Sequence, residues 1–397
     1  MASDVPEELI RCKQCGNNVP RLTFCIRCGD PLSDEYQADA VRSQRRRFVA
    51  APDERVSSPA FVSTFFPQLP SADMRSFRRA SAAGLVIIVG LALAGLFPVA
   101  IVSAALLVPL LMVLYLYDVD VYEDEPISVI GATMLWGAVA GVAYGLLLRN
   151  QSGVGGSTGF GGSFGGGPNI SEILLNGVGL PIVELALMLA GPLLLLRWRR
   201  FNDVLDGATF GAASAVSFGG AHLLVQSVSM FGAGLRPPGD ALPWVIQIVS
   251  LGVLQPVIAA GAVGAVGAAF WLRFRAPVAD HHKLGPVGNP VLALAGAIVL
   301  VVVAGLAGSL LTLIPTTVVL AMVALVALLW LRRALHLGLL QELREVTEAR
   351  SITCPNCGRE TPEHDFCGQC GIALRALPRP RRAQSDTQPE ARPDPHS

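Results

Sequence analysis

Long apolar segments recur through the middle of this chain, and they constrain its fold more than any other feature. A helix needs about 20 consecutive apolar residues to cross the hydrocarbon core of a bilayer. Eight segments meet this requirement, and the sequence predicts membrane-spanning helices near 80–97, 99–117, 127–148, 173–196, 207–230, 243–272, 290–307 and 314–331. Pro98 marks the boundary between the first two, and the last two divide between Ser309 and Pro315. We therefore expect an all-α polytopic membrane protein whose surroundings are the lipid bilayer.

The composition supports a membrane protein rather than a soluble domain. Hydrophobic residues make up 52% of the 397 positions and charged residues 15%, whereas soluble domains carry about 25% charged residues. The first residues, Met1 to Glu8, lack the basic and apolar regions of a secretory signal peptide. We therefore expect the N-terminus to lie in the cytoplasm.

Basic residues in the loops predict the orientation of the helices, because loops rich in arginine and lysine remain in the cytoplasm. Arginine clusters precede the first predicted helix and follow the fourth, sixth and eighth; they contain Arg75, Arg78, Arg79, Arg197, Arg199, Arg200, Arg273, Arg275, Arg332 and Arg333. The opposite loops, one of them the Gly/Ser-rich segment 150–168, carry Arg149 and Arg236. We therefore expect a protein of the cell (inner) membrane with both termini in the cytoplasm.

The eight cysteines form two groups of four near the ends of the chain, each with the spacing Cys-x2-Cys-x9-Cys-x2-Cys. The groups are Cys12, Cys15, Cys25 and Cys28, and Cys354, Cys357, Cys367 and Cys370. Two Cys-x-x-Cys pairs can surround one tetrahedral zinc ion. A glycine follows the second cysteine of every pair, where the backbone must turn sharply; these are Gly16, Gly29, Gly358 and Gly371. The sequence therefore predicts two metal-binding modules.

The two modules form an internal repeat, because their similarity extends beyond the cysteines. Pro20, Phe24 and Leu32 of the first correspond to Pro362, Phe366 and Leu374 of the second. Both resemble the short zinc ribbons appended to membrane proteins. A site closed by four cysteines has no open position for a reacting water, so we expect two structural zinc ions. The ribbons would stabilise the chain ends or bind a protein partner that the sequence does not name. Disulfides are the alternative, which a reducing cytoplasm disfavours.

These features divide the chain into six parts: an N-terminal zinc ribbon at 1–32, a disordered linker at 33–78, a transmembrane domain at 79–335, a cytoplasmic helix at 336–350, a C-terminal zinc ribbon at 351–376 and a disordered tail at 377–397. The linker contains a basic cluster between Arg42 and Arg47, which can bind anionic lipid or nucleic acid. A solvated linker explains this cluster more simply, so nucleic acid is not an expected partner.

Polar residues inside the predicted helices mark a candidate site. At about 1.5 Å rise per residue, Glu184, His222 and Gln255 lie at similar depths on successive helices, whereas Gln247 lies nearer the membrane surface. An ionisable residue in a membrane is costly and indicates a functional site by default. Glu184 and His222 can pair to support helix packing, bind a metal ion or take part in transport. The residues alone leave these alternatives open.

Several short motifs resemble the PrsW family of intramembrane metalloproteases. Residues 122–126, Tyr-Glu-Asp-Glu-Pro, precede Trp136-Gly137; Pro181-Ile-Val-Glu184 resembles the start of the first family motif; and Asp206-Gly207, followed by Phe218-x3-His222, resembles the second. The resemblance covers about residues 118–275. It implies a helical membrane core with a zinc site that includes Glu184 and His222, and hydrolysis of a peptide bond within the membrane.

The chain also departs from these family motifs. Leu185 and Met188 stand in place of the second Glu and the Lys of the first motif, and His222 replaces a Glu, as in the related CAAX-protease branch. Gln255 lies where the third motif, His-x3-Asp, is expected, and glutamine is a weak neutral ligand. We therefore expect a PrsW-like scaffold without catalysis. The alternatives are an active zinc metalloprotease that uses Glu184 and His222 with a third zinc ion, and a membrane carrier in which Glu184 titrates.

Overall fold

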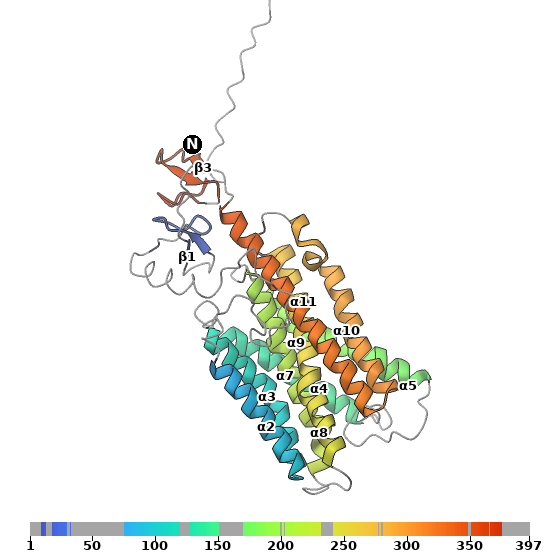
Figure 1. Ribbon diagram of the computed structural model, residues 1–397. Helices are drawn as coiled ribbons and strands as arrows, with labels where there is room; N and C mark the ends of the chain where they lie inside the picture. The colour runs from blue at the N-terminus through green and yellow to red at the C-terminus, as the bar shows by residue number, and fades with distance from the viewer. Residues whose placement is uncertain are drawn as a thin grey trace, which may run out of the picture.

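The computed structural model of the protein describes residues 9–12, 18–29, 32, 75–119, 127–150, 170–198, 201, 203–231, 241–276, 278, 281–347, 351–364 and 366–374 (Figure 1). The predicted tail at 377–397 and most of the predicted linker at 33–78 lie outside these residues. The same is true of Cys15, Gly16 and the motif at 122–126.

Eight helical segments of the described chain are long and apolar enough to cross a membrane. Five are single helices: α2 (Arg75–Leu93), α3 (Phe97–Val119), α4 (Ile127–Asn150), α7 (Val204–Phe231) and α10 (Pro290–Leu310). Two are composite: α5 (Ile170–Leu174), η2 (Leu175–Gly179) and α6 (Leu180–Leu195), and α8 (Ala241–Val249), η3 (Ser250–Leu254) and α9 (Gln255–Phe274). The eighth is α11 (Leu313–Thr347), and a short 3-10 helix, η4 (His281–Gly288), precedes α10. The predicted all-α polytopic fold is confirmed.

The first two helices begin and end at different residues from those predicted. Helix α2 starts at Arg75, so the last residues of the predicted linker are helical. Phe77 explains this extension, because its ring packs edge-to-face on Tyr115 of α3 at a centroid distance of 5.3 Å. The turn between α2 and α3 lies at Gly95, whose φ is 78°, and not at Pro98. Pro98 instead occupies the first turn of α3, where no helical hydrogen bond needs its missing N–H.

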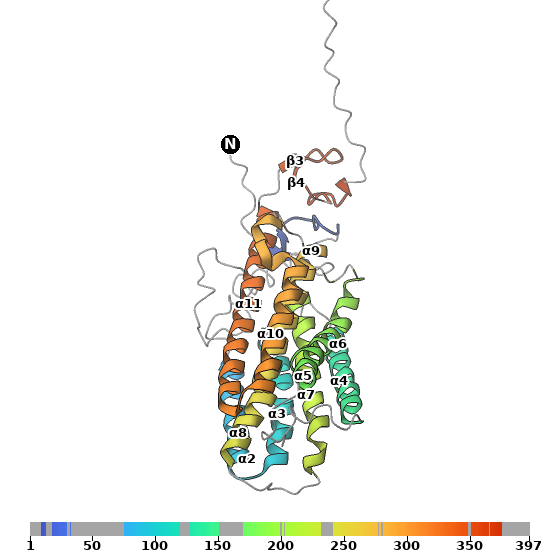
Figure 2. The same cartoon turned by 90° about the vertical axis from the view of Figure 1, so that its right-hand side faces the viewer.

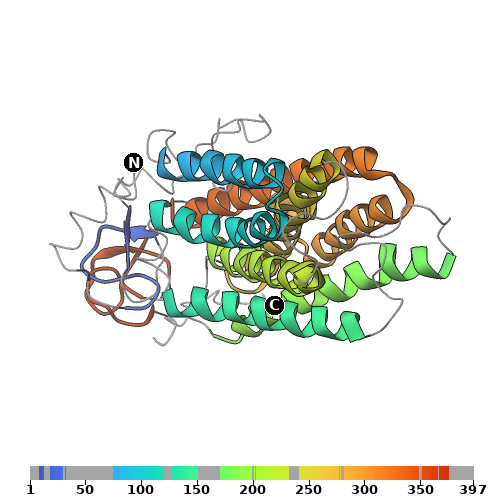
Figure 3. The ribbon, with the colours of Figure 1, turned by 90° about the horizontal axis from the view of Figure 1, so that it is seen from below.

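Helix α7 lies at the centre of the bundle and contacts α3, α4, α6, α9 and α11. In the view from below, it runs between α3 and α4 (Figure 3). A Cβ atom on Gly137 of α4 would lie 2.1 Å from the carbonyl oxygen of Ser214, and one on Gly267 of α9 would lie 2.1 Å from that of Gly207. Small residues at these positions let the helix backbones touch, which is how helices associate in lipid.

Two membrane segments contain one turn of π-helix each, and a proline follows each turn. In η2 the N–H of Leu180 donates to the carbonyl of Leu175, and Pro181 comes next. In η3 the N–H of Gln255 donates to the carbonyl of Ser250, and Pro256 comes next. A proline ring clashes with the carbonyl four residues earlier in a regular α-helix. The wider π turn accommodates that clash, and such turns are frequent at functional sites.

Helix α11 continues without a break from the membrane segment to Thr347, through most of the predicted cytoplasmic helix at 336–350. The ribbons lie beyond this end of the bundle (Figures 1 and 2). In the N-terminal ribbon, β1 (Leu9–Arg11) pairs antiparallel with β2 (Asn18–Pro20). In the C-terminal ribbon, β3 (Ser351–Thr353) pairs with β4 (Glu360–Pro362) in the equivalent register. The internal repeat of the sequence is therefore a repeat of structure.

Candidate functional site

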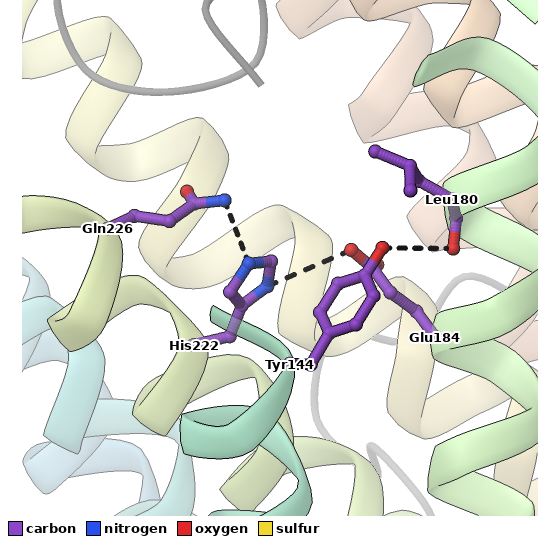
Figure 4. A network of polar contacts seen from close by, with 5 residues as sticks. All are labelled: Tyr144, Leu180, Glu184, His222 and Gln226. Carbon is purple, nitrogen blue, oxygen red and sulfur yellow. Dashed lines mark hydrogen bonds and ion pairs between the residues drawn. The ribbon is translucent and has the colours of Figure 1, made fainter. Parts of the chain in front are cut away.

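A polar cluster lines a cavity of about 130 Å³ inside the bundle. Helix α6 contributes Glu184, α7 contributes His222 and Gln226, and Tyr144 of α4 lies beside them (Figure 4). Apolar residues form most of the remaining wall, including Phe218, Pro181 and Pro256. Both π-helical segments border the cavity through Asn176 of η2 and Leu251 of η3. The widened turns thus lie next to the polar cluster.

Both ring nitrogens of His222 face another side chain. Nδ1 lies 3.7 Å from Oε1 of Glu184, and Nε2 lies 2.8 Å from the amide nitrogen of Gln226. Because the Gln226 amide nitrogen donates, Nε2 accepts, and Nδ1 is the nitrogen whose proton faces the carboxylate. The His222 side chain is 13% exposed and that of Glu184 is 30% exposed. The imidazole is therefore held between a carboxylate and an amide.

Tyr144 of helix α4 completes the cluster. Its hydroxyl donates to the carbonyl oxygen of Leu180 at 3.4 Å and lies beside the Glu184 carboxylate (Figure 4). Its ring meets the His222 ring edge-on at a centroid distance of 5.1 Å. The ring of Phe218 lies 5.8 Å from that of His222. These contacts fix the position of the imidazole from three sides.

Counting residues along the predicted helices, which placed Glu184, His222 and Gln255 at similar depths, predicted part of this cluster. Glu184 and His222 meet, and Gln255 lines the same cavity, although its side chain makes no hydrogen bond within the described residues. Gln247 borders a smaller neighbouring cavity. The sequence argument missed Gln226, although a residue four positions after His222 shares its helix face. It also missed Tyr144, for which the sequence contains no comparable signal.

Hydrogen bonds outside the polar cluster also join neighbouring helices at or near the motif residues. The indole N–H of Trp136 donates to the carbonyl of Leu187 at 3.0 Å. The hydroxyl of Ser214 donates to the carbonyl of Met188 at 2.8 Å. Met188 is buried and lines the cavity with an apolar side chain. At the start of α7, the Asp206 carboxylate accepts from the N–H of Asp203 at 3.0 Å. These residues support the helix bundle.

The ribbon cysteines have the arrangement that a metal ion needs. The sulfur atoms of Cys354, Cys357, Cys367 and Cys370 all lie within 4.8 Å of one another, and so do those of the three described N-terminal cysteines, Cys12, Cys25 and Cys28. Sulfur–sulfur distances include 3.9 Å for Cys354 to Cys370 and 3.5 Å for Cys12 to Cys28. A tetrahedral zinc ion with Zn–S bonds of about 2.3 Å separates its sulfurs by roughly 3.8 Å. The donor set therefore fits such an ion.

The backbone at the glycine turns and the ionisation of the cysteine thiols also bear on the metal-site prediction. Gly29, Gly358 and Gly371 have φ values of 78°, 67° and 72°, as predicted for residues that follow a second cysteine. The backbone N–H of Ile372 lowers the pKa of the Cys370 thiol to about 7, whereas burial raises the pKa of Cys367 to about 11. Metal ions bind the thiolate form. The described cysteines form no disulfide, and their sulfurs converge as a metal ion requires, so the metal-site prediction is supported over the disulfide alternative.

Among the described histidines, cysteines and acidic residues, groups of three or more that could hold a metal ion occur in the ribbons. The membrane cavity brings together one carboxylate and one imidazole. Catalytic zinc sites use three protein ligands and an open position. Comparison of the chain with protein-family models, curated proteins and solved structures finds no match.

Proposed function

We propose that this chain is a non-catalytic membrane scaffold with a PrsW-like core, in which two zinc ribbons form an interaction module on the cytoplasmic side. One observation carries the proposal: Glu184 and Gln226 occupy both ring nitrogens of His222. A histidine must direct a free nitrogen lone pair at a metal to bind it. Here the N–H of Nδ1 faces a carboxylate, and the Nε2 lone pair accepts from an amide.

The motif resemblance accounts for the position of the cluster, and the substitutions account for its lack of catalysis. Glu184 and His222 come from the two segments that resemble the first two family motifs, and Gln255 lines the cavity from the segment expected to hold the third. Hydrolysis needs a metal-bound water and a general base. The cavity presents a neutral glutamine where the third motif would supply a histidine and an aspartate, which supports a structural role for the carboxylate–imidazole pair.

Metal content tests the proposal. Purified full-length protein should contain two zinc ions per chain, and His222→Ala should contain the same number. Cys354→Ser combined with Cys370→Ser should lower the count to one, because these changes remove two ligands of one ribbon. A third, chelator-sensitive zinc ion that disappears in His222→Ala would instead establish the metalloprotease alternative.

The cavity itself favours a second function, a membrane carrier in which Glu184 binds and releases a proton or small cation. A carboxylate lining an internal cavity is typical of proton and ion pathways in membranes, and the two adjacent π-helical turns interrupt the surrounding helices. Protein reconstituted in liposomes should then show cation or proton flux that Glu184→Gln abolishes and Gln255→Leu retains. Equal background flux for all three proteins would contradict the carrier.

The proposed orientation places the helix bundle in the cell (inner) membrane and both ribbons in the cytoplasm. Arg78 in the first turns of α2, Arg197 after α6, and Arg273 near the end of α9 support it, because these arginines flank the helix ends on the ribbon side. A reporter fused after Leu374 should behave as cytoplasmic, and one inserted within 151–168 as external. The reverse pattern would overturn this orientation.

A further inference from the structure

The two ribbons contact one another through reciprocal hydrogen bonds. The N–H of Phe24 donates to the carbonyl of Gly368 at 2.9 Å, and the N–H of Phe366 donates to the carbonyl of Ile26 at 2.7 Å. Phe24 corresponds to Phe366 in the internal repeat, and Ile26 corresponds to Gly368. The same pair of positions therefore meets twice, once in each direction. This is the geometry of a two-fold symmetric dimer, here formed within one chain.

The side chains repeat this reciprocity. The ring of Phe366 lies over Gly29, where an added Cβ would be 2.8 Å from the ring, and the ring of Phe24 lies over Gly371, where the distance would be 3.0 Å. Leu22 packs against Gly368, and a Cβ on that glycine would lie 2.1 Å from its Cδ1 atom. Each ribbon thus covers the turn of the other with a phenylalanine.

Most of the described interface residues are adjacent to a metal ligand. Phe24 and Phe366 directly precede the third cysteine of their ribbons, and Gly29 and Gly371 directly follow the fourth. A ribbon this small has too little core to hold these turns without its metal ion, because metal-binding energy is its folding energy. Loss of the ion from one ribbon therefore removes the surface on which the other ribbon rests.

We propose that the ribbons act as one clasp that requires two metal ions, in which each ion stabilises the binding of the other. The proposal rests on the predicted zinc sites but not on the absence of catalysis in the membrane. Strand β2 contacts α11, and the C-terminal ribbon begins at Ser351, four residues after α11 ends. When both ions are bound, the paired ribbons hold the N-terminal ribbon against the end of α11. The N-terminal and C-terminal ribbons then lie side by side at one end of the bundle.

Zinc release from the full-length protein in detergent micelles tests the coupling. In Cys12→Ser/Cys28→Ser, the single remaining ion of the C-terminal ribbon should pass to a chromophoric chelator about tenfold faster than in the wild type, a coupling of about 1.4 kcal/mol. Gly368→Leu should accelerate release to a similar degree, since the new side chain must displace Leu22. Combined with the cysteine changes, Gly368→Leu should add nothing. Gln369→Ala, at the neighbouring position, should release zinc at the wild-type rate.

A protease site inserted into the linker gives a second readout that needs no interface variant. After cleavage between 33 and 74, the N-terminal ribbon should remain bound to the membrane domain during gel filtration and dissociate when chelator removes both ions. Dissociation with both ions retained, or continued binding after both ions are lost, would overturn the clasp. Equal zinc release from the C-terminal ribbon with and without the N-terminal ligands would overturn it as well. None of these three results changes the two-zinc count of the proposed scaffold.

Discussion

The ribbons and the membrane cavity each gather polar groups from separated positions, but they complete the set to different degrees. In the C-terminal ribbon, four sulfurs lie within 4.8 Å of one another. In the cavity, one carboxylate and one imidazole lie 3.7 Å apart, and an amide satisfies the remaining ring nitrogen. The ribbon therefore offers four donors of one kind to a single ion, whereas the cavity pairs one carboxylate with one imidazole. The difference indicates that the number of donors converging on one point separates the two clusters: four in the C-terminal ribbon, and one carboxylate and one imidazole in the cavity.

The two regions also differ in what stabilises them. A ribbon depends on its ion, because it buries few apolar side chains, among them Ile10, Val19 and Ile26 in the N-terminal one. The bundle depends on close contact between helix backbones at small residues, such as Gly207 with Gly267. Perturbing one type of support should therefore leave the other region intact.

Removing ribbon ligands should have the largest effect. Cys354→Ser/Cys357→Ser should lose one zinc ion and unfold the C-terminal ribbon, since zinc contributes on the order of 10 kcal/mol to such modules. Zinc per chain measures the loss, and circular dichroism should show that the membrane helices persist. The exposed, non-ligand change Arg359→Ser should keep both ions. Loss of the helical signal together with the ion would show that the regions are not independent.

Adding a methyl group between α7 and α9 should have the next largest effect. In Gly267→Ala the new Cβ meets the Gly207 carbonyl, so the bundle should lose about 2–3 kcal/mol of unfolding free energy through overpacking. Unfolding by sodium dodecyl sulfate in mixed micelles measures it, with unchanged zinc content. Gly131→Ala is the matched control, because no heavy atom lies within 4 Å of its added Cβ. Equal stability of the two variants would contradict the contact.

The carboxylate–imidazole pair should contribute less. A double-mutant cycle with Glu184→Gln and His222→Ala should yield a coupling energy of about 0.6–1.7 kcal/mol, the range measured for interhelical hydrogen bonds in membranes. Micelle unfolding gives the four free energies. Additive effects would mean that the pair does not stabilise the bundle, and would return Glu184 to the carrier alternative.

The hydroxyl of Ser214 should contribute least. Ser214→Ala removes the hydrogen bond to Met188 and should cost about 0.6 kcal/mol in the same unfolding assay. Ser217→Ala, one turn further along α7, is the control. The Ser217 hydroxyl is buried without a hydrogen-bond partner within the described residues, so its removal should be neutral or slightly stabilising. A larger loss for Ser217→Ala than for Ser214→Ala would contradict this assignment.

The number of membrane helices could be predicted because length and apolarity are local properties of the sequence. The helix ends were less predictable, since contacts such as Phe77 with Tyr115 extend α2 beyond its apolar segment. Pro181 and Pro256 signal irregularity, but a proline can kink, break or widen a helix. Packing decides which of these outcomes occurs, so the π-helical turns were not predicted.

The site and the ribbons show the same limit. Counting residues along helices places Glu184 and His222 at one depth, but it does not fix the rotation of α4 that brings Tyr144 to them, because α4 is apolar on most of its surface. Within the ribbons, cysteine spacing predicts the metal ligands. It does not predict the pairing of the ribbons, because Phe24 and Phe366 could equally have packed inside their own modules.

Gly368 also determines which ribbons can pair. In the N-terminal ribbon its counterpart is Ile26. In the observed arrangement, a Cβ added to Gly368 would lie 2.1 Å from the Cδ1 atom of Leu22. Two N-terminal ribbons from neighbouring molecules therefore cannot adopt this arrangement without a collision between Ile26 and Leu22. Where ribbons of several copies meet in a crowded membrane, this single missing side chain lets a C-terminal ribbon accept an N-terminal one in an arrangement that two N-terminal ribbons cannot share.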